Sequence, residues 1–263
     1  MHQIIAYIKF LFRSKNQHGV HSPFVFDLVT KCFYDKKEYP SYELISAFQK
    51  ELQYKKEHIE VTDFGAGSKV FGSGKRRISE IALNAGISPK RARLINRLVP
   101  YLGIKNALEL GTSVGAGTAA ISAGNNVQIT TIEGCPKTAE IAEQLFDKFG
   151  CSNVTLKKGE FDEVLEEMLS GNSSSKEPPK FDLIYFDGNH QKEATVKYFQ
   201  KLLPTIHNNS VWIFDDIHWS KEMEAAWNEI KAQPEVRVTI DTFFWGFVFF
   251  RKEQEKEDFV IRI

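Results

Sequence analysis

Polar side chains crowd the ends of two apolar segments in the second half of the sequence. One apolar run ends at Asp187 and is followed three residues later by His190, and a second ends with Asp215 and Asp216, shortly before His218. An imidazole titrates near neutral pH and can take a proton from an attacking hydroxyl. In open α/β sheets, ligands bind beyond the carboxyl ends of the strands. If the two runs are such strands, these residues are candidates for catalysis.

A glycine-rich segment in the middle of the chain could hold a cofactor. The run Ala107-Leu-Glu109-Leu places an apolar strand directly before Gly111, Gly115 and Gly117, where a helix begins. Glycines allow a sharp turn and a close approach of backbone to ligand, and the helix N-terminus offers free N–H groups. A second β-rich run ends in Glu133, about twenty residues on, where a carboxylate can accept hydrogen bonds from ribose hydroxyls. Together these features indicate a nucleoside-bearing cofactor.

The pattern Glu109-x-Gly111-x-x-x-Gly115-x-Gly117, followed by Glu133, resembles the signature of class I methyltransferases. It is most similar to the small O-methyltransferases related to catechol O-methyltransferase, over residues 103–252. The resemblance implies S-adenosylmethionine as cofactor and a Rossmann-like α/β fold, with a seven-stranded, mostly parallel sheet whose last strand is antiparallel. It assigns the methionine part to Glu109, Gly111, Thr112, Ser113, Gly115 and Gly117, the ribose to Glu133, and the adenine to Gly159, Glu160 and Phe161, with Asp187 also beside the cofactor.

The same resemblance suggests roles for the polar strand ends. Similar enzymes carry metal ligands at positions that correspond to Asp187, Asp215 and Asp216, and an all-oxygen set suits Mg²⁺. Asp216 stands where the usual ligand is Asn, and caps of turns or helices are the alternative reading of Asp187 and Asp216. His190 occupies the position of the family's catalytic Lys and is the candidate base, together with Asp187. His218 is a weaker candidate for substrate contact, because Trp219 beside it suggests a packed helix start.

Five β/α units should position these residues. The sequence predicts strands near 105–110, 128–133, 153–157, 181–187 and 209–215, and helices near 117–124, 136–149, 160–169, 191–203 and 219–231. Residues 236–240 and 244–251 should form an antiparallel hairpin at the sheet edge, and 171–180 should be a surface loop. Residues 1–102 read as a helical region, without strands, that serves substrate covering or oligomerisation. Residues 103–263 read as the cofactor domain.

Composition limits the classes of partner. Lys plus Arg and Asp plus Glu both number 34, so no global field draws the chain to nucleic acid or to an anionic membrane. Three scattered cysteines fit neither a disulfide framework nor a zinc site, which favours the cytoplasm. The apolar opening segment is interrupted by Lys9 and is too short for stable membrane insertion. It predicts an amphipathic helix that packs on the body or on a second copy, a homodimer, with a membrane surface as the lesser alternative.

A basic segment, residues 69–97, precedes the predicted cofactor domain. Among its eight cations are Arg76 and Arg77, which could recognise a small anionic substrate. A solvated helix face and RNA binding are the alternatives, although no RNA-binding motif is evident. The run Asp63-Phe-Gly-Ala-Gly-Ser imitates a cofactor loop but lacks a strand before it, so residues 63–74 are expected to cover the site instead. The sequence thus predicts a methyltransferase for a small hydroxylated acceptor. RNA or protein methylation, a non-catalytic nucleoside-binding module and an NAD-dependent oxidoreductase are the competing hypotheses.

Overall fold

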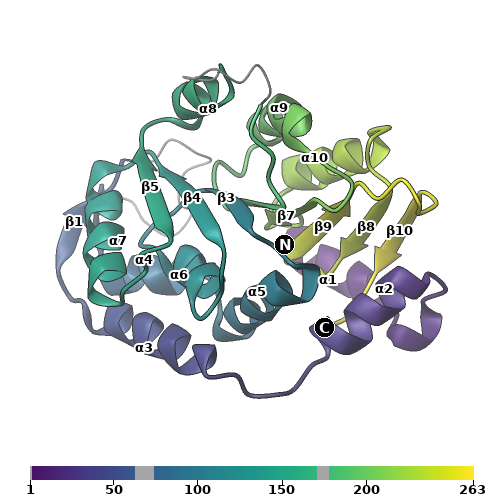
Figure 1. Cartoon of the computed structure of the whole chain (residues 1–263), viewed down its shortest axis with the longest axis horizontal. Helices are drawn as coiled ribbons and strands as arrows, with labels where there is room; N and C mark the ends of the chain where they lie inside the picture. Colours follow the sequence, from purple (N-terminus) through teal and green to yellow (C-terminus); the bar gives the residue numbers. More distant parts are fainter. Residues whose placement is uncertain (1, 63–73, 171–177) are drawn as a thin grey trace. The chain divides into compact units, whose positions relative to one another are not determined.

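The computed structural model describes residues 2–62, 74–170 and 178–263 (Figure 1). The chain divides into two compact units. The central unit is Lys37–Pro179, and the terminal unit combines Met1–Lys36 with Lys180–Ile263. The whole run that begins at Asp63 lies outside the described residues, together with Lys69 and the rest of 63–73. Residues 171–177 of the predicted loop lie outside them as well. No helix of the described residues is long and apolar enough to cross a membrane.

The central unit holds three parallel strands in the order β3-β4-β5, which are Asn106–Leu110, Gln128–Glu133 and Val154–Lys158. Helices α6 (Ala116–Ser122), α7 (Pro136–Lys148) and α8 (Phe161–Ser170) follow these strands in turn. Before them come α3 (Ser41–Tyr54), α4 (Ile78–Asn84) and α5 (Pro89–Leu102). Strands β1 (His58–Glu60) and β2 (Lys75–Arg77) pair antiparallel. This pair corrects the expectation of a strand-free amino-terminal region.

The terminal unit holds five strands in the order β10-β8-β9-β7-β6. They are β6 (Leu183–Phe186), β7 (Val211–Asp215), β8 (Val238–Asp241), β9 (Trp245–Phe249) and β10 (Glu257–Val260). Strand β9 runs antiparallel to both β7 and β8, whereas β6 is parallel to β7 and β10 is parallel to β8. Helices α9 (Lys192–Leu202) and α10 (Lys221–Ala232) follow β6 and β7. Two short amino-terminal helices, α1 (His2–Arg13) and α2 (Pro23–Leu28), complete the unit.

The predicted α/β class, with mostly parallel strands and an antiparallel last strand, is confirmed. The seven predicted strands correspond to β3 through β9, and all five predicted helices are present. Two details differ. An eighth strand, β10, follows the hairpin, and β9 inserts between β7 and β8, so the hairpin is not at the edge of the strands in this unit. The edge is β10, whose sequence Glu-Asp-Phe-Val is too polar to read as a buried strand.

Both faces of β9 are covered, which explains its fully buried sequence. A Cβ at Gly246 would lie 2.7 Å from the Trp227 ring of α10, so glycine is what lets that helix approach the strand. Side chains alternate along a strand, and Phe247 and Phe249 therefore point to the other face. There Phe249 contacts Phe24 of α2, with ring centroids 5.0 Å apart. Figure 1 shows α10 and α2 on the two sides of these strands.

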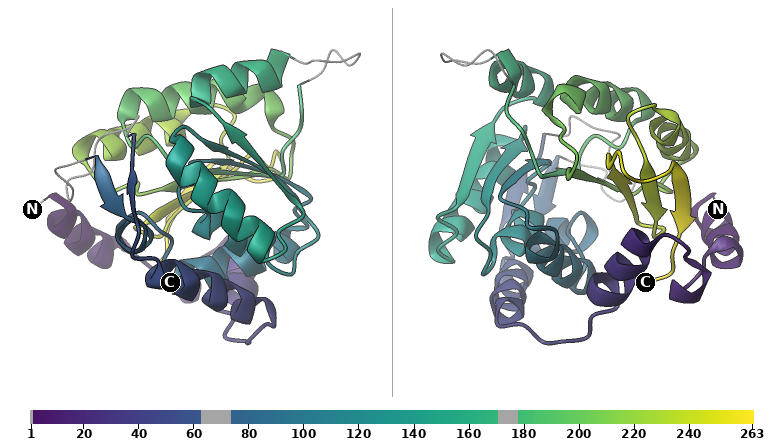
Figure 2. Two further views of the ribbon diagram at one scale, coloured as in Figure 1. Left: turned by 90° about the vertical axis from the view of Figure 1, so that its left-hand side faces the viewer. Right: turned by 45° about the vertical axis from the view of Figure 1, so that its right-hand side comes forward.

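Helix α1 packs on this unit through a narrow stripe. Ala6 and Phe10 are buried in a cluster with Phe243, against which Val260 of β10 packs. The right-hand view of Figure 2 shows the purple helix α1 beside the last yellow strand. Leu11 also packs against this cluster and Tyr7 contacts the Phe243 ring, whereas other large apolar residues of α1 are exposed, Phe12 to 88%. Large exposed apolar side chains gathered on one helix are unusual for a monomer. The predicted contact with the body is therefore present, and it occupies only one side of the helix.

Candidate functional site

The glycine loop joins β3 to α6 through backbone conformations that favour glycine. Gly111 and Gly115 have φ of 105° and 87°, and Ser113, between them, also has a positive φ of 49°. A Cβ at Gly115 would lie 2.8 Å from the Phe146 ring of α7, which packs against the loop. The loop therefore turns sharply, and the first helical residue, Ala116, follows at once. This is the strand, turn and helix succession that the sequence predicted.

Glu109 is the penultimate residue of β3 and is 1% exposed. The hydroxyl groups of Thr118, on α6, and Thr131, on β4, both donate to its Oε2. Its other oxygen, Oε1, has no hydrogen-bond partner among the described residues. Burial raises the pKa of Glu109 to about 7, although the two threonine hydroxyls act in the opposite direction. A buried carboxyl oxygen without a partner is costly and suggests that a ligand group belongs there.

Glu133 lies at the end of β4 and contacts the same loop. Its Oε2 accepts a hydrogen bond from the Ser113 N–H at 2.7 Å, and its Oε1 accepts one from the Cys135 N–H at 2.8 Å. Burial raises the pKa of Glu133, while these two backbone donors lower it. The Gly159 N–H donates to the Glu133 carbonyl, which brings the segment before α8 beside it. The structure thus gathers Glu109, the glycine loop, Glu133 and Gly159 in one part of the central unit.

In the terminal unit, His190 follows β6 on a tight turn. Asn189 has a φ of 50° and its Oδ1 is buried without a partner among the described residues. His190 is half-buried, and its imidazole forms no hydrogen bond or ion pair with any described residue. Asp187 closes the same strand and is engaged by neighbouring groups. Both ring nitrogens of His190 are therefore available to a ligand.

The carboxylates proposed as metal ligands do not form a cation site. Asp215 is buried, and its Oδ1 accepts from the Asp216 N–H at 2.9 Å while its Oδ2 lies 3.4 Å from the Tyr185 hydroxyl. Asp216 adopts a positive φ of 54°. Within the described ranges, no three His, Cys, Asp or Glu side chains form a group that could hold a metal ion. The donors of Asp187, Asp215 and Asp216 thus do not fit the predicted magnesium.

His218 is occupied by the protein itself. Its Nδ1 lies 2.8 Å from Glu224 Oε1 on α10, and its Nε2 lies 2.9 Å from Asp241 Oδ2 on β8. Burial lowers the pKa of His218, but the two carboxylates outweigh burial and raise it. Both ring nitrogens must donate, so the ring is a cation in this arrangement. This geometry argues against a role for His218 as a base.

The basic segment is divided between two elements. Arg76 and Arg77 lie half-buried on β2, and Arg77 is 3.7 Å from Glu80. On α5, Arg93 pairs with Glu38 at 3.0 Å and lies over the ring of Tyr42. Several of the cations that the sequence assigned to a substrate therefore have partners inside the protein. Arg76 and Arg77 stay predictions as substrate residues.

Some important residues were missed by the sequence reasoning. Thr118 and Thr131, which donate to Glu109, carry no motif of their own. Thr118 follows the last glycine of the loop, and Thr131 shares a face of β4 with Glu133. A hydroxyl beside a buried acid is the signal that could have indicated them.

Comparison with known proteins finds a likeness to methyltransferases. The family model described as a methyltransferase domain matches residues 108–217, which include the glycine loop, Glu133, Asp187 and His190. Over these residues the chain is similar to methyltransferase domains. An O-methyltransferase from Bacillus cereus, solved with SAH, is 18% identical, with a TM-score of 0.54 over 82% of this chain and 93% of that chain.

Two further solved structures agree with this domain. The SAH-bound methyltransferase PaMTH1 from Podospora anserina is 15% identical, with a TM-score of 0.60 over 89% of this chain and 97% of that chain. The O-methyltransferase TomG from Streptomyces achromogenes, solved with SAM, is 13% identical, with a TM-score of 0.55 over 82% and 91%. At these identities the likeness establishes the fold. The search of curated proteins gives no match to this chain.

The raised pKa of Glu109 predicts how the stability of the protein depends on pH. The folded state binds this proton more tightly than the unfolded state, so the contribution is complete below the ordinary value of 4.5 and is lost as pH rises through about 7. Glu109→Gln resembles the protonated form at every pH. The variant should match the parent in acid and exceed its unfolding free energy above neutrality, by roughly 3 kcal/mol at most.

Urea unfolding at several pH values measures this difference. Glu140→Gln, on the outer side of α7 and paired with Lys137, is the matched control and should follow the parent throughout. Parallel curves for the parent and Glu109→Gln from acid to above neutrality would show that Glu109 is already ionised in the folded protein.

Proposed function

We propose that this protein transfers a methyl group from S-adenosylmethionine to a hydroxyl oxygen of a small acceptor. The methyltransferase domain and its likeness to O-methyltransferases solved with SAH or SAM support this activity. The observation that carries the proposal is the unpartnered Oε1 of Glu109, buried beside the glycine loop. An ammonium group at this position would supply the missing donor and would favour the ionised carboxylate.

The residues of the central unit suit the three parts of that cofactor. Glu109 and the backbone of Gly111, Thr112, Ser113, Gly115 and Gly117 would hold the methionine part. Glu133 would accept from the ribose hydroxyls, with its carboxylate already fixed by two backbone donors. Gly159, Glu160 and Phe161 would contact the adenine. The bound cofactor supplies a methyl group made electrophilic by its sulfonium.

His190 is the proposed general base. It would accept the proton of the acceptor hydroxyl as the oxygen forms its bond to the methyl carbon and the carbon–sulfur bond breaks. The products are a methyl ether and S-adenosylhomocysteine, with the proton on the imidazole. A half-buried imidazole that forms no hydrogen bond or ion pair with any described residue suits this role, because a positioned imidazole can accept the proton of an attacking hydroxyl. Asp187, at the end of the same strand, would orient the reacting groups.

The acceptor is proposed to be small and anionic. Arg76 and Arg77 are the groups assigned to its negative charge, because a guanidinium binds carboxylates through paired hydrogen bonds. Residues 1–102 would serve acceptor recognition or oligomerisation. Methylation of RNA or protein is the runner-up function, with a non-catalytic module of the same fold behind it. The neutral overall charge gives RNA no general attraction.

The cofactor assignment predicts a pH-dependent affinity. Calorimetric titration with S-adenosylhomocysteine should give a micromolar dissociation constant above pH 7, where Glu109 is ionised. One pH unit below, the affinity should fall about tenfold, because the ammonium then competes with a proton. Glu109→Gln should bind more weakly and show no such dependence. Binding of NAD⁺ in preference to S-adenosylhomocysteine would contradict the function, and equal pH dependence in both proteins would remove Glu109 from the site.

The base assignment predicts a loss of turnover without a loss of binding. With 3,4-dihydroxybenzoate as a probe acceptor, His190→Gln should lower kcat by about a hundredfold or more, the usual contribution of a general base. Its affinity for S-adenosylhomocysteine should stay within about twofold of the parent. His21→Gln, an exposed site in the same unit, is the control and should keep full activity. Full turnover by His190→Gln would disprove the assignment.

The donor geometry predicts that methyl transfer continues in excess EDTA, because the strand-end carboxylates do not form a group that could hold a metal ion. The rate with the same probe acceptor, measured before and after chelation, should be unchanged. Activity that disappears with EDTA and returns with Mg²⁺ would instead restore Asp187, Asp215 and Asp216 as metal ligands.

A further inference from the structure

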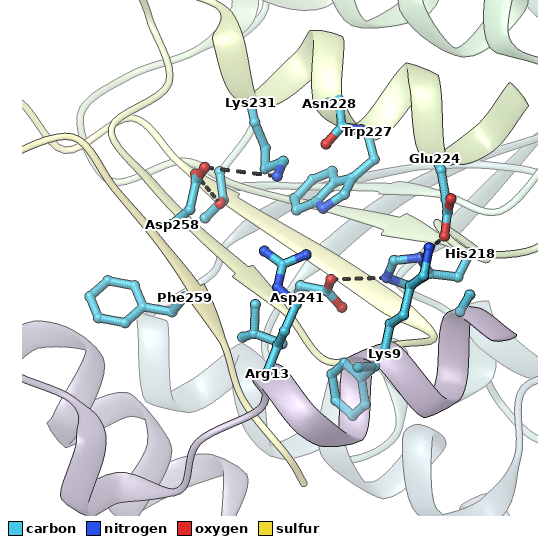
Figure 3. A pocket seen from close by; sticks show the side chains of 14 residues that line it. Lys9, Arg13, His218, Glu224, Trp227, Asn228, Lys231, Asp241, Asp258 and Phe259 are labelled. Atoms are coloured by element: carbon cyan, nitrogen blue, oxygen red, sulfur yellow. Dashed lines mark hydrogen bonds and ion pairs between the residues drawn. The ribbon is translucent and has the colours of Figure 1, made fainter. Parts of the chain in front are cut away.

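The terminal unit contains a cavity of about 220 Å³ that the proposed reaction does not use. Its walls come from α1, α10, β8 and β10, and all of its lining residues belong to this unit. Phe10, Trp227 and Val260 contribute its apolar lining. At roughly 30 Å³ per water-sized volume, the space suits a ligand of about seven to ten non-hydrogen atoms. Figure 3 shows Arg13 of α1, Trp227 of α10 and Asp241 of β8 directed toward one another around it.

The acidic groups of this cavity already have partners. Glu224 and Asp241 hold His218 between them, and Asp241 Oδ1 also accepts from the Phe243 N–H at 2.8 Å. Asp258 accepts from the Thr239 hydroxyl at 2.6 Å and lies 3.8 Å from Lys231. Carboxylates that already have partners within the protein have little need of a cationic ligand.

Two cations of the cavity, in contrast, are uncommitted. Lys9 and Arg13 lie one turn apart on α1, and their side chains form no hydrogen bond or ion pair with any described residue. In Figure 3 the guanidinium of Arg13 points from α1 into the cavity. The indole Nε1 of Trp227, a residue only 3% exposed, is a further donor that finds no acceptor in the described part of the chain. Lys9, Arg13 and the Trp227 indole thus offer this cavity donors without acceptors among the described residues.

The charge balance narrows the class of ligand. With His218 protonated between its carboxylates, four cationic groups face three carboxylates around the cavity. One negative charge completes the balance, whereas a dianion such as phosphate would also meet the repulsion of Asp241 and Asp258. The aromatic walls favour an apolar body over a hydrated ion. We propose that this cavity binds a small aromatic monocarboxylate, with its carboxylate on Lys9 and Arg13. The proposal is independent of methyl transfer.

Benzoate is the probe, and benzamide is its neutral counterpart of the same shape. Dissociation constants from saturation-transfer NMR on the full chain should show benzoate binding about tenfold more tightly than benzamide, because its hydrogen bonds are charge-assisted. The double variant K9Q/R13Q should reduce the affinity for benzoate to that for benzamide. Inorganic phosphate should not displace benzoate.

The double variant K221Q/R237Q is the matched control, because it removes the same two charges from this unit at positions that do not line the cavity. It should bind benzoate as the parent does, and both variants should keep the parent melting temperature. The proposal is overturned if benzoate shows no saturable binding at millimolar concentration. Equal affinities for benzoate and benzamide, or equal loss in the two double variants, also overturn it.

Discussion

The arrangement of the glycine loop between β3 and α6 depends on one buried carboxyl group. Glu109 of β3 receives hydroxyl donors from α6 and β4, so it joins the strand before the loop to the helix after it and to the neighbouring strand. Removing a carboxylate from water is expensive, and here only one of its two oxygens is compensated within the described residues. A pKa near 7 is the consequence, since protonation relieves the cost. The loop is therefore built around a group that a cationic ligand can complete.

In the terminal unit, the cost of removing charged groups from water is offset by ion pairs between opposite charges. His218 lies between carboxylates of α10 and β8 and stacks on Phe243, which contacts α1, so the ion pairs hold three elements in place. His190, also a few residues beyond a strand end, has no such partners among the described residues. Two histidines that looked alike in the sequence are thus separated by their surroundings. His218 is held in ion pairs within the protein, whereas the His190 imidazole forms none with the described residues.

The sequence was informative where local pattern decides structure. Strands β3 to β9 are short apolar runs with turn residues between them, and the glycine loop needs its residue types for backbone reasons. It was uninformative for β10, a polar edge strand, and for the pair β1 and β2, where Lys75-Arg-Arg shows no alternation. The partners of Glu109 and His218 were also hidden. Asp241 lies 23 residues after His218, so their contact depends on tertiary packing that no motif records.

The number of charged residues in a segment overestimates its capacity to bind ions of opposite charge, because some of those residues pair within the protein. The basic segment before β3 looked like an anion site, yet Arg93 is paired with Glu38 and Arg77 lies near Glu80. The apolar residues of α1 predicted how it packs, whereas Lys9 and Arg13 were assigned no binding role. In the structure, however, Lys9 and Arg13 are left without acidic partners in the described residues while every carboxylate of their cavity has one. A binding site is marked by polar groups that remain unsatisfied after folding, because only their pairing energy is still available to a ligand.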